Sequence, residues 1–188
     1  MKRESIPALI LAAGSGKRMG GPKALRIWEG ETLLHRTARI ALTAGCQPVL
    51  AVVGNWDAGA IELPLQLIAN PEAAEGMASS IRAGVAALPP GAKGVLLLTV
   101  DQIRLNEAVL RQLLGNFLET PDQPIACAYA GTLGIPAVLP RRLFPALLAL
   151  RGDRGAKGIL LQEEALAIPF PGGEEDLDTP QDLLTFRR

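Results

Sequence analysis

The segment Leu9–Lys23, with the sequence L-I-L-A-A-G-S-G-K-R-M-G-G-P-K, joins an apolar run to a glycine-rich loop. The apolar run covers Ala8–Ala13, and a short run of this kind bounded by glycine is typical of a buried strand. The loop that follows contains four glycines, with Lys17, Arg18 and Lys23 among them. Glycine lets the main chain approach a ligand closely, and main-chain N–H groups beside cations bind phosphate. We therefore expect this loop to hold the triphosphate of a nucleotide.

The loop differs from two better-known phosphate-binding fingerprints. A Walker A loop requires Ser or Thr after Gly-Lys, whereas Gly16-Lys17 is followed by Arg18. A dinucleotide-binding loop requires a third glycine where this chain has Met19. An ordinary glycine-rich turn is the simplest alternative. The three cations within the loop and the strand that leads into it favour phosphate binding over that alternative.

Composition excludes several other classes of protein. The chain has 188 residues, enough for one domain covering residues 1–188 with a sizeable core. Lys+Arg and Asp+Glu balance at 19 each, and aromatic residues make up 4%, which disfavours binding to nucleic acid or a membrane surface. Cys46 and Cys127 lie far apart in sequence, so we expect buried thiols in a reducing cytoplasm. We expect neither a signal peptide nor a membrane helix, and the lack of a heptad seam favours a monomer.

Strand-like and helix-like segments alternate along the chain. The predicted strands cover residues 6–13, 48–53, 65–69, 93–100, 125–129, 134–139 and 165–170. The predicted helices cover residues 32–44, 79–88, 106–118, 141–150 and 156–162, with a last helix after Thr179, while residues 55–64 are expected to be irregular. Strand 93–100 is apolar without alternation, so both of its faces should be buried beneath helices. The link at 130–133 is too short for a helical crossover, so its two strands should be antiparallel or form one bent strand. We therefore expect a three-layer α/β/α fold with a mostly parallel sheet and one antiparallel strand.

The carboxyl ends of parallel strands meet at one rim, where such sheets bind their ligands. The glycine loop follows the first strand and Asp101 ends the fourth, so both should face this rim. A carboxylate at the end of a buried strand suits Mg²⁺, although Asp101 could instead cap a turn. A polar strand-to-helix connection should reach the same rim and could bind base or ribose, or merely cap the helix; it contains Asn70, Gly76, Ser79 and Ser80.

Other polar residues are less informative. Asp178, with Asp176 before it, belongs to D-T-P-Q-D, a strong helix start, so by its own sequence Asp178 is interpreted as a helix cap. His35 should lie on a solvated helix face, and the charges of the Gly152–Gly155 turn do not decide whether it is a substrate loop. No Ser-His-Asp arrangement or reactive cysteine is apparent. Cations for phosphate and a carboxylate for Mg²⁺ on one rim indicate phosphoryl or nucleotidyl transfer.

The quoted motif resembles L-A-A-G-x-x-x-R-M-G-x-x-K, the signature of nucleotidyltransferases with a Rossmann-like, GT-A-like fold. Further stretches at residues 70–84, 101–102, 134–136, 152–157 and 176–183 are similar to the molybdopterin cytidylyltransferase group, so the resemblance spans nearly the whole chain. It implies transfer of CMP from CTP to the phosphate of molybdopterin, with Mg²⁺ and release of pyrophosphate. An apo-enzyme of the molybdenum hydroxylase class is the implied partner.

The resemblance also implies roles for individual residues. Lys23, Arg18 and Asp101 would be catalytic, with Lys23 acting on the α-phosphate in the transition state. Asp101 and Asp178 would bind the metal. The implied nucleotide-binding set is Leu11, Ala12, Ala13, Gly14, Ser15, Gly16, Lys17, Arg18, Lys23, Asn70, Gly76, Ser79 and Ser80.

Three alternatives stay open at this stage. Ala12-Ala13 resembles the cytidylyl members, whereas guanylyl members tend to carry a second glycine there, so a guanylyltransferase is the nearest alternative. The same scaffold also serves sugar-phosphate and polyol-phosphate acceptors. The chain departs from the group at Ile103, where Pro is usual, and at Lys157, where Arg is frequent. A non-catalytic nucleotide-binding protein that delivers a cofactor is the alternative from another class.

Overall fold

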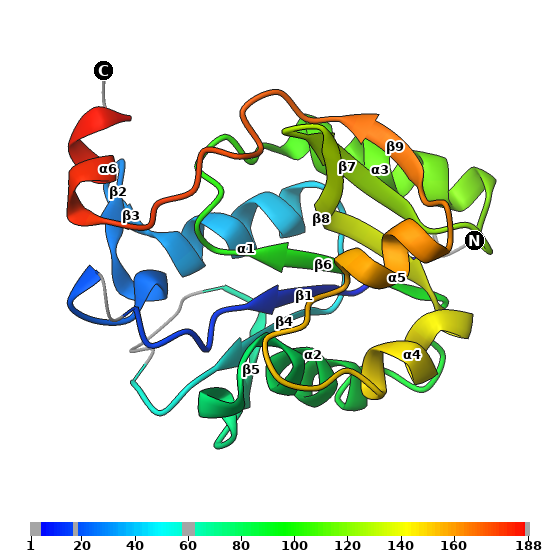
Figure 1. Cartoon of the computed structure of the whole chain (residues 1–188), viewed down its shortest axis with the longest axis horizontal. Helices are drawn as coiled ribbons and strands as arrows, with labels where there is room; N and C mark the ends of the chain where they lie inside the picture. The colour runs from blue at the N-terminus through cyan, green and yellow to red at the C-terminus, as the bar shows by residue number, and fades with distance from the viewer. Residues whose placement is uncertain (1–4, 17–18, 58–62, 187–188) are drawn as a thin grey trace.

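The described part of the chain forms a seven-stranded sheet in the order β5-β4-β1-β6-β8-β7-β9 (Figure 1). The computed structural model describes residues 5–16, 19–57 and 63–186. The strands are β1 (Ala8–Leu11), β4 (Val49–Val53), β5 (Leu65–Ala69), β6 (Gly94–Thr99), β7 (Ile125–Tyr129), β8 (Thr132–Pro140) and β9 (Leu166–Pro169). All seven coincide with predicted strands, although β1 is shorter than the apolar run that predicts it.

Strand β8 is the antiparallel member of this sheet. It pairs antiparallel with both β6 and β7, whereas the pairs β1–β4, β1–β6, β4–β5 and β7–β9 are parallel. The tight turn that reverses the chain before β8 has positive φ at Ala130 and Gly131. The expectation of a mostly parallel sheet with one antiparallel strand is therefore confirmed.

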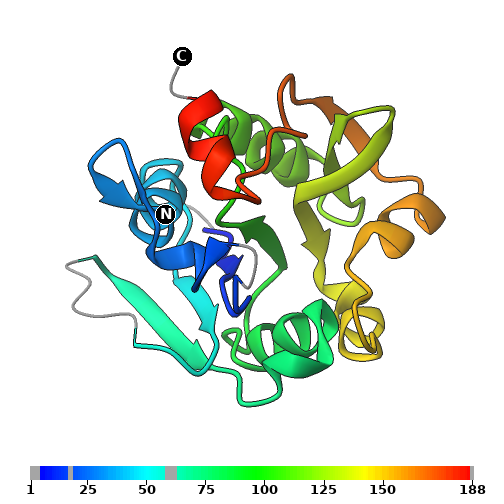
Figure 2. The ribbon, with the colours of Figure 1, turned by 60° about the vertical axis from the view of Figure 1, so that its left-hand side comes forward.

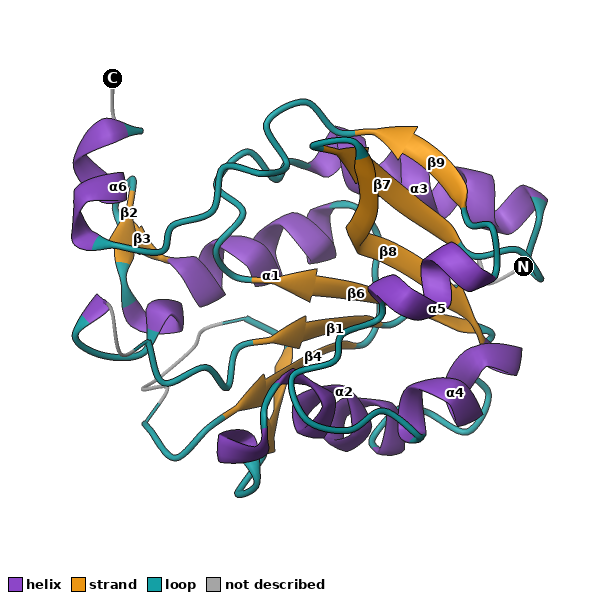
Figure 3. Cartoon of the chain, in the orientation of Figure 1, coloured by secondary structure: helices purple, strands orange, loops and turns teal. Residues whose placement is uncertain are grey.

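Helices cover both faces of the sheet, as Figure 3 shows. On one side lie α1 (Leu33–Thr43) and α3 (Glu107–Glu119), and on the other lie α2 (Met77–Ala86), α4 (Phe144–Leu148) and α5 (Lys157–Gln162). Successive β1 side chains point to opposite faces, so Ala8 and Ile10 join the first core cluster while Leu9 and Leu11 join the second. This is the three-layer α/β/α arrangement that the continuous apolar strands predict.

The strand order reverses beside β1, which fixes where a ligand can bind. From β1 the chain moves to β4 and β5 on one side, and then crosses to β6 on the other side. The loops after β1 and β6 therefore diverge and leave a crevice at the carboxyl ends of these two strands.

Several local features differ from the sequence predictions. A short hairpin lies where only a turn was expected, and each of its strands, β2 (Ile27–Trp28) and β3 (Glu31–Thr32), has two residues. Helix α2 begins at Met77, two residues before the predicted start, because Gly76 is its N-cap residue. The predicted helix at 141–150 is the 3-10 helix η4 (Arg141–Leu143) followed by α4.

Two further predictions concern the cysteines and membrane helices. Cys46 and Cys127 are buried free thiols, as predicted, and burial raises the pKa of each to about 12. Among the described helices, none combines the length and the apolar character needed to cross a bilayer. Residues 58–62 of the stretch predicted to be irregular lie outside the described residues.

Two glycines provide a matched test of this packing. A Cβ on Gly94 would lie 2.6 Å from Phe117 Cζ and 2.8 Å from the Leu139 carbonyl oxygen, whereas a Cβ on Gly115 in α3 meets nothing within 4 Å. We expect Gly94→Ala to lower the free energy of unfolding by about 1–3 kcal/mol through overpacking. Gly115→Ala should raise it by about 0.5–1 kcal/mol through helix propensity. Urea denaturation of both variants checks the pair, and equal effects would contradict the packing described here.

Candidate active site

Three segments that are distant in sequence meet at the carboxyl ends of β1 and β6. The first is the glycine loop, which leads into the 3-10 helix η2 (Lys23–Leu25). The second is Asp101, just after β6, and the third is the stretch before α6 (Pro180–Thr185). Figure 2, in which this end of the sheet is turned forward, shows α6 and the β2–β3 hairpin on the same side of the molecule.

Lys23 links these three segments. Its Nζ donates to Asp101 Oδ2 at 2.9 Å and forms a second ion pair with Asp178 Oδ1. Burial alone would lower the pKa of Lys23, but the charges of Asp101 and Asp178 and their hydrogen bonds outweigh it, so this pKa is raised. The ammonium is therefore charged at neutral pH and neutralises one of the two carboxylates that it touches.

Main-chain hydrogen bonds attach the segment before Asp178 to the residues that follow β6. Gln102 and Asp176 form an antiparallel bridge, and the Leu177 N–H donates to the Asp101 carbonyl at 3.0 Å. The buried Gln102 side chain donates from Nε2 to the carbonyls of Ile135 and Gly173, each at 3.0 Å. These bonds bring Asp178 beside Lys23.

The interpretation of Asp178 as a helix cap is wrong. The N-cap residue of α6 is Thr179, which forms a capping box with Asp182. The Asp178 side chain is 54% exposed and is directed to Lys23 instead. A capping motif marks the start of a helix, but it does not say where the residue before the cap points.

Asp176 is a third acidic group at this centre. Burial, followed by repulsion from Asp101 and Asp178, raises the pKa of Asp176 to about 7, although Lys23 opposes the shift. Its Oδ1 atom is buried without a hydrogen-bond partner among the described residues. The centre therefore carries more acidic groups than the single Lys23 ammonium can neutralise.

A pocket of about 870 Å³ opens beside this centre. The sequence-predicted residues that line it are Leu11, Ala12, Ala13, Gly14, Ser15, Gly16, Lys23, Asn70, Gly76, Ser80 and Asp101. Ser79 is buried behind the lining, and Asp178 reaches the pocket through its contact with Lys23. Lys17 and Arg18 lie outside the described residues.

The glycine loop folds back on itself. The Met19 and Gly21 N–H groups both donate to the Gly16 carbonyl, at 2.8 and 3.1 Å. Gly16 has φ +58°, and a Cβ there would lie 1.9 Å from the Gly21 carbonyl oxygen, so the position requires glycine. Gly14 has no heavy atom within 4 Å of the place where its Cβ would be, which leaves open space over the main chain that lines the pocket.

Asn70 acts through other residues rather than by itself. Its Nδ2 donates to Ser79 Oγ at 2.9 Å and to Ser80 Oγ at 3.1 Å, while its Oδ1 accepts from the Glu72 N–H at 3.0 Å. Both of its N–H groups are thus used within the protein. Ser79 Oγ in turn donates to the Gly76 carbonyl at 2.8 Å, so the network fixes Ser80 at the pocket wall.

Sequence reasoning missed several lining residues, including Trp56 and Met77, and left undecided the Gly152–Gly155 turn, whose Asp153 also lines the pocket. Trp56 follows the end of β4, so the rule that ligands bind at the carboxyl rim could have found it. Asp153 lies far along the chain, and only the fold brings it to this pocket. Ile103, which replaces the usual Pro, is 6% exposed in the core, and Arg36 donates to its carbonyl at 2.8 Å. The substitution therefore puts no side chain into the pocket.

The donor set suits a divalent cation with bound phosphates. Asp101 and Asp178 share one ammonium, so their combined charge exceeds that of their partner. Within residues 5–16, 19–57 and 63–186, no three Asp, Glu, His or Cys side chains are grouped to form a ready-made metal cage. Mg²⁺ commonly uses one or two carboxylates and takes its other ligands from phosphate and water. The residues present therefore fit such an ion.

Comparison with known proteins points in the same direction. Residues 8–166 match the family model of the MobA-like NTP transferase domain. The molybdenum cofactor guanylyltransferase of Rhodobacter capsulatus is 30% identical, over 95% of this chain and 93% of its own. The molybdenum cofactor cytidylyltransferase of Escherichia coli is 25% identical, over 97% and 96%. A protein named nicotine blue oxidoreductase, from Paenarthrobacter nicotinovorans, is 32% identical over 95% of this chain and 94% of its own.

Solved structures share the same fold. The crystal structure of Rv0371c from Mycobacterium tuberculosis matches with a TM-score of 0.78 and 24% identity, covering 97% of this chain and 98% of that protein. At this level of identity the likeness supports the architecture alone.

Asp176 should make the stability of the folded protein depend on pH. Its pKa is about 7 when folded and near the ordinary 3.8 when unfolded, so the folded protein binds more protons between these values. The Asp176 contribution to stability is therefore lost as the pH rises from about 4 through 7. We expect Asp176→Asn to stabilise the metal-free protein at pH 8 and to have much less effect at pH 4.

Denaturation with a chelator present, at pH 4, 6 and 8, measures this difference, and Asp122→Asn on an exposed loop is the matched control. A stability difference for Asp176→Asn that is the same at all three pH values would contradict the assignment.

Proposed function

Because the chain belongs to the family of MobA-like NTP transferase domains, we propose that it transfers CMP from CTP to the phosphate of molybdopterin. The observation that carries this proposal is the position of Lys23 between Asp101 and Asp178, at the end of the pocket that the glycine loop lines. A cation beside paired carboxylates and a phosphate loop suits attack at the α-phosphorus of a nucleoside triphosphate.

The choice of CTP as the nucleotide depends on fewer residues than the proposal of nucleotidyl transfer does. Ala12 and Ala13 resemble the cytidylyl members, and both line the pocket. Relatives are named both for cytidylyl and for guanylyl transfer, so GTP is the second nucleotide to test. Sugar or polyol phosphates are the corresponding alternatives for the acceptor.

The reaction forms one bond and breaks one at the α-phosphorus. An oxygen of the acceptor phosphate, already ionised at neutral pH, attacks in line, and pyrophosphate leaves with the electron pair of the broken bond. Lys23 offsets the charge that develops on the α-phosphate, while Gly14 allows the main chain to approach the triphosphate and Gly16 allows the loop to fold back on itself. No general base is required, because the nucleophile carries no proton to remove.

Asp101 and Asp178 would hold the Mg²⁺ ion, which supplies charge neutralisation of the phosphates when bound. Lys23, whose ammonium lies beside both carboxylates, would act on the α-phosphate. Arg18 is proposed to hold the triphosphate from the adjoining part of the loop. The product would then pass to an apo-enzyme of the molybdenum hydroxylase class.

A redox activity is the second candidate, because a full-length relative is named as an oxidoreductase. The residues favour transfer over this candidate, since Met19 replaces the third glycine of a dinucleotide loop. Oxidation of NADH or NADPH by the purified protein, in place of pyrophosphate release, would identify the redox reaction.

Removal of either charged partner should abolish transfer without unfolding the protein. We expect Lys23→Ala and Asp101→Ala to reduce pyrophosphate release by at least about 10²-fold, the effect of losing one preorganised charge. Lys93→Ala, an exposed lysine at the opposite end of β6, should retain normal activity. Circular dichroism confirms folding, and near-normal pyrophosphate release by a folded Lys23→Ala or Asp101→Ala variant would refute the assignment.

The nucleotide and acceptor can be identified in one experiment. Pyrophosphate release is measured with CTP, GTP, UTP and ATP, each with molybdopterin and with candidate sugar and polyol phosphates. We expect the highest kcat/KM for CTP with molybdopterin. Higher turnover with GTP would make the protein a guanylyltransferase, and nucleotide binding without any release would make it a delivery protein.

A further inference from the structure

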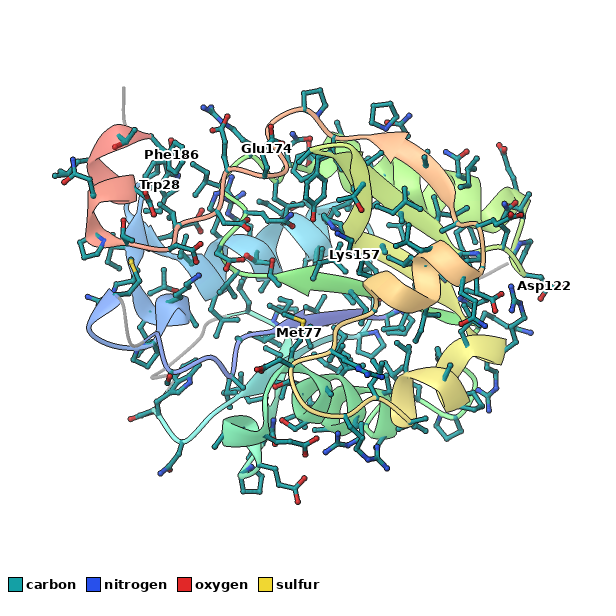
Figure 4. All side chains as sticks on the ribbon, viewed as in Figure 1. Trp28, Met77, Asp122, Lys157, Glu174 and Phe186 are labelled. Atoms are coloured by element: carbon teal, nitrogen blue, oxygen red, sulfur yellow. The ribbon has the colours of Figure 1, made fainter. Side chains whose placement is uncertain are left out.

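The pocket is lined by a second carboxylate in addition to Asp101. Asp153 lies on the turn that connects α4 to α5, and this turn reaches the pocket beside Gly76, Met77 and Ser80. Figure 4 shows Met77 at the start of α2, near the middle of the molecule. The sequence alone leaves the role of this turn undecided.

Hydrogen bonds fix the turn to the beginning of α2. The Gly152 carbonyl accepts from the Ala78 N–H at 3.0 Å, and the Gly152 N–H donates to Glu75 Oε1 at 3.1 Å. Arg82 completes the connection, because it donates to Glu75 Oε1 at 2.8 Å and to the Leu150 carbonyl at 2.9 Å. The main chain around Asp153 is therefore held against α2 on both sides of Gly152.

The exposed Asp153 side chain lies close over the main chain of Gly76. A Cβ on Gly76 would lie 2.2 Å from Asp153 Oδ1 and 2.7 Å from the Gly152 carbonyl oxygen. A Cβ on Gly155 would lie 2.9 Å from the Sδ atom of Met77. Glycine is needed at position 76 for the main chain of the turn to lie this close, and Asp153 therefore lies over Gly76 at the pocket wall.

Charge places Asp153 beside the nucleoside part of a bound nucleotide and not beside its phosphates. Phosphates are drawn to Lys23 and the glycine loop, and a carboxylate would repel them. Ser80, which is 6% exposed, accepts a hydrogen bond from Asn70 Nδ2, so its own hydroxyl proton can be donated into the pocket. The pocket wall around Gly76 therefore offers a hydrogen-bond acceptor at Asp153 and a hydrogen-bond donor at Ser80.

We propose that Asp153 is a specificity-determining residue that accepts a hydrogen bond from the exocyclic amino group of the nucleobase. The inference rests on the proposed nucleotidyl transfer and adds the recognition of the base. Cytosine and guanine carry such an amino group, whereas uracil presents the O4 carbonyl in the place where cytosine has its amino group. The carboxylate attracts the amino group and repels the carbonyl, so it selects CTP or GTP over UTP.

Asp153→Asn tests this directly, because an amide can donate a hydrogen bond to the O4 of uracil. The wild type should prefer CTP or GTP to UTP, and the ratio of kcat/KM between the preferred nucleotide and UTP should fall about 10-fold in the variant. Asp122→Asn, the same substitution on an exposed loop at the far end of the molecule (Figure 4), should leave the ratio unchanged. Comparison of CTP with GTP shows which amino-bearing base is accepted.

Two outcomes would overturn the proposal. An equal loss for all four nucleotides in Asp153→Asn would place the carboxylate at the ribose, and a lower Tm with unchanged selectivity would make it a stabiliser of the turn. If the wild type releases no pyrophosphate, the proposed function fails. The role of Asp153 in base recognition is then tested by calorimetry, which measures the Kd of each nucleotide in the presence of Mg²⁺. A CTP-to-UTP or GTP-to-UTP ratio of Kd that moves only in Asp153→Asn would support the recognition role, and an unmoved ratio would overturn it.

Discussion

The ion pairs of Lys23 with Asp101 and Asp178 connect the parts of this protein on which its proposed chemistry depends. They join the glycine loop, the end of β6 and the stretch before α6, which are far apart in sequence. One ammonium faces two carboxylates, and Asp176 adds a third acidic group whose pKa is raised to about 7 by burial and by these neighbours. Among the described residues of this centre, acidic groups therefore outnumber the Lys23 ammonium, and bound Mg²⁺ would offset the difference.

Most of the fold could be predicted from local sequence patterns. The continuous apolar run before Asp101 predicts a strand buried on both faces. The short link at residues 130–133 predicts antiparallel pairing of the strands on either side of it. The β2–β3 hairpin escaped prediction because two-residue strands show no periodicity. Its position depends on tertiary contacts: Trp28 is buried in the core cluster against which Phe186 packs, and Figure 4 shows the two side chains together.

The residues of the candidate site that directly follow parallel strands could be predicted from the sequence. Asp101 and the glycine loop follow two parallel strands, so both reach the same rim. Asp178 could not be placed from its own segment, because its position depends on the bridge between Gln102 and Asp176. Asp153 is a similar case, since only the contacts of Gly152 with α2 bring it to the pocket.

The central claim is that this centre moves a nucleoside monophosphate and not a terminal phosphate. The most direct measurement follows the products by mass spectrometry after incubation with CTP, Mg²⁺ and molybdopterin. We expect the acceptor to gain the mass of CMP and one pyrophosphate to appear for each acceptor modified. An unmodified acceptor, or release of orthophosphate in place of pyrophosphate, would contradict it.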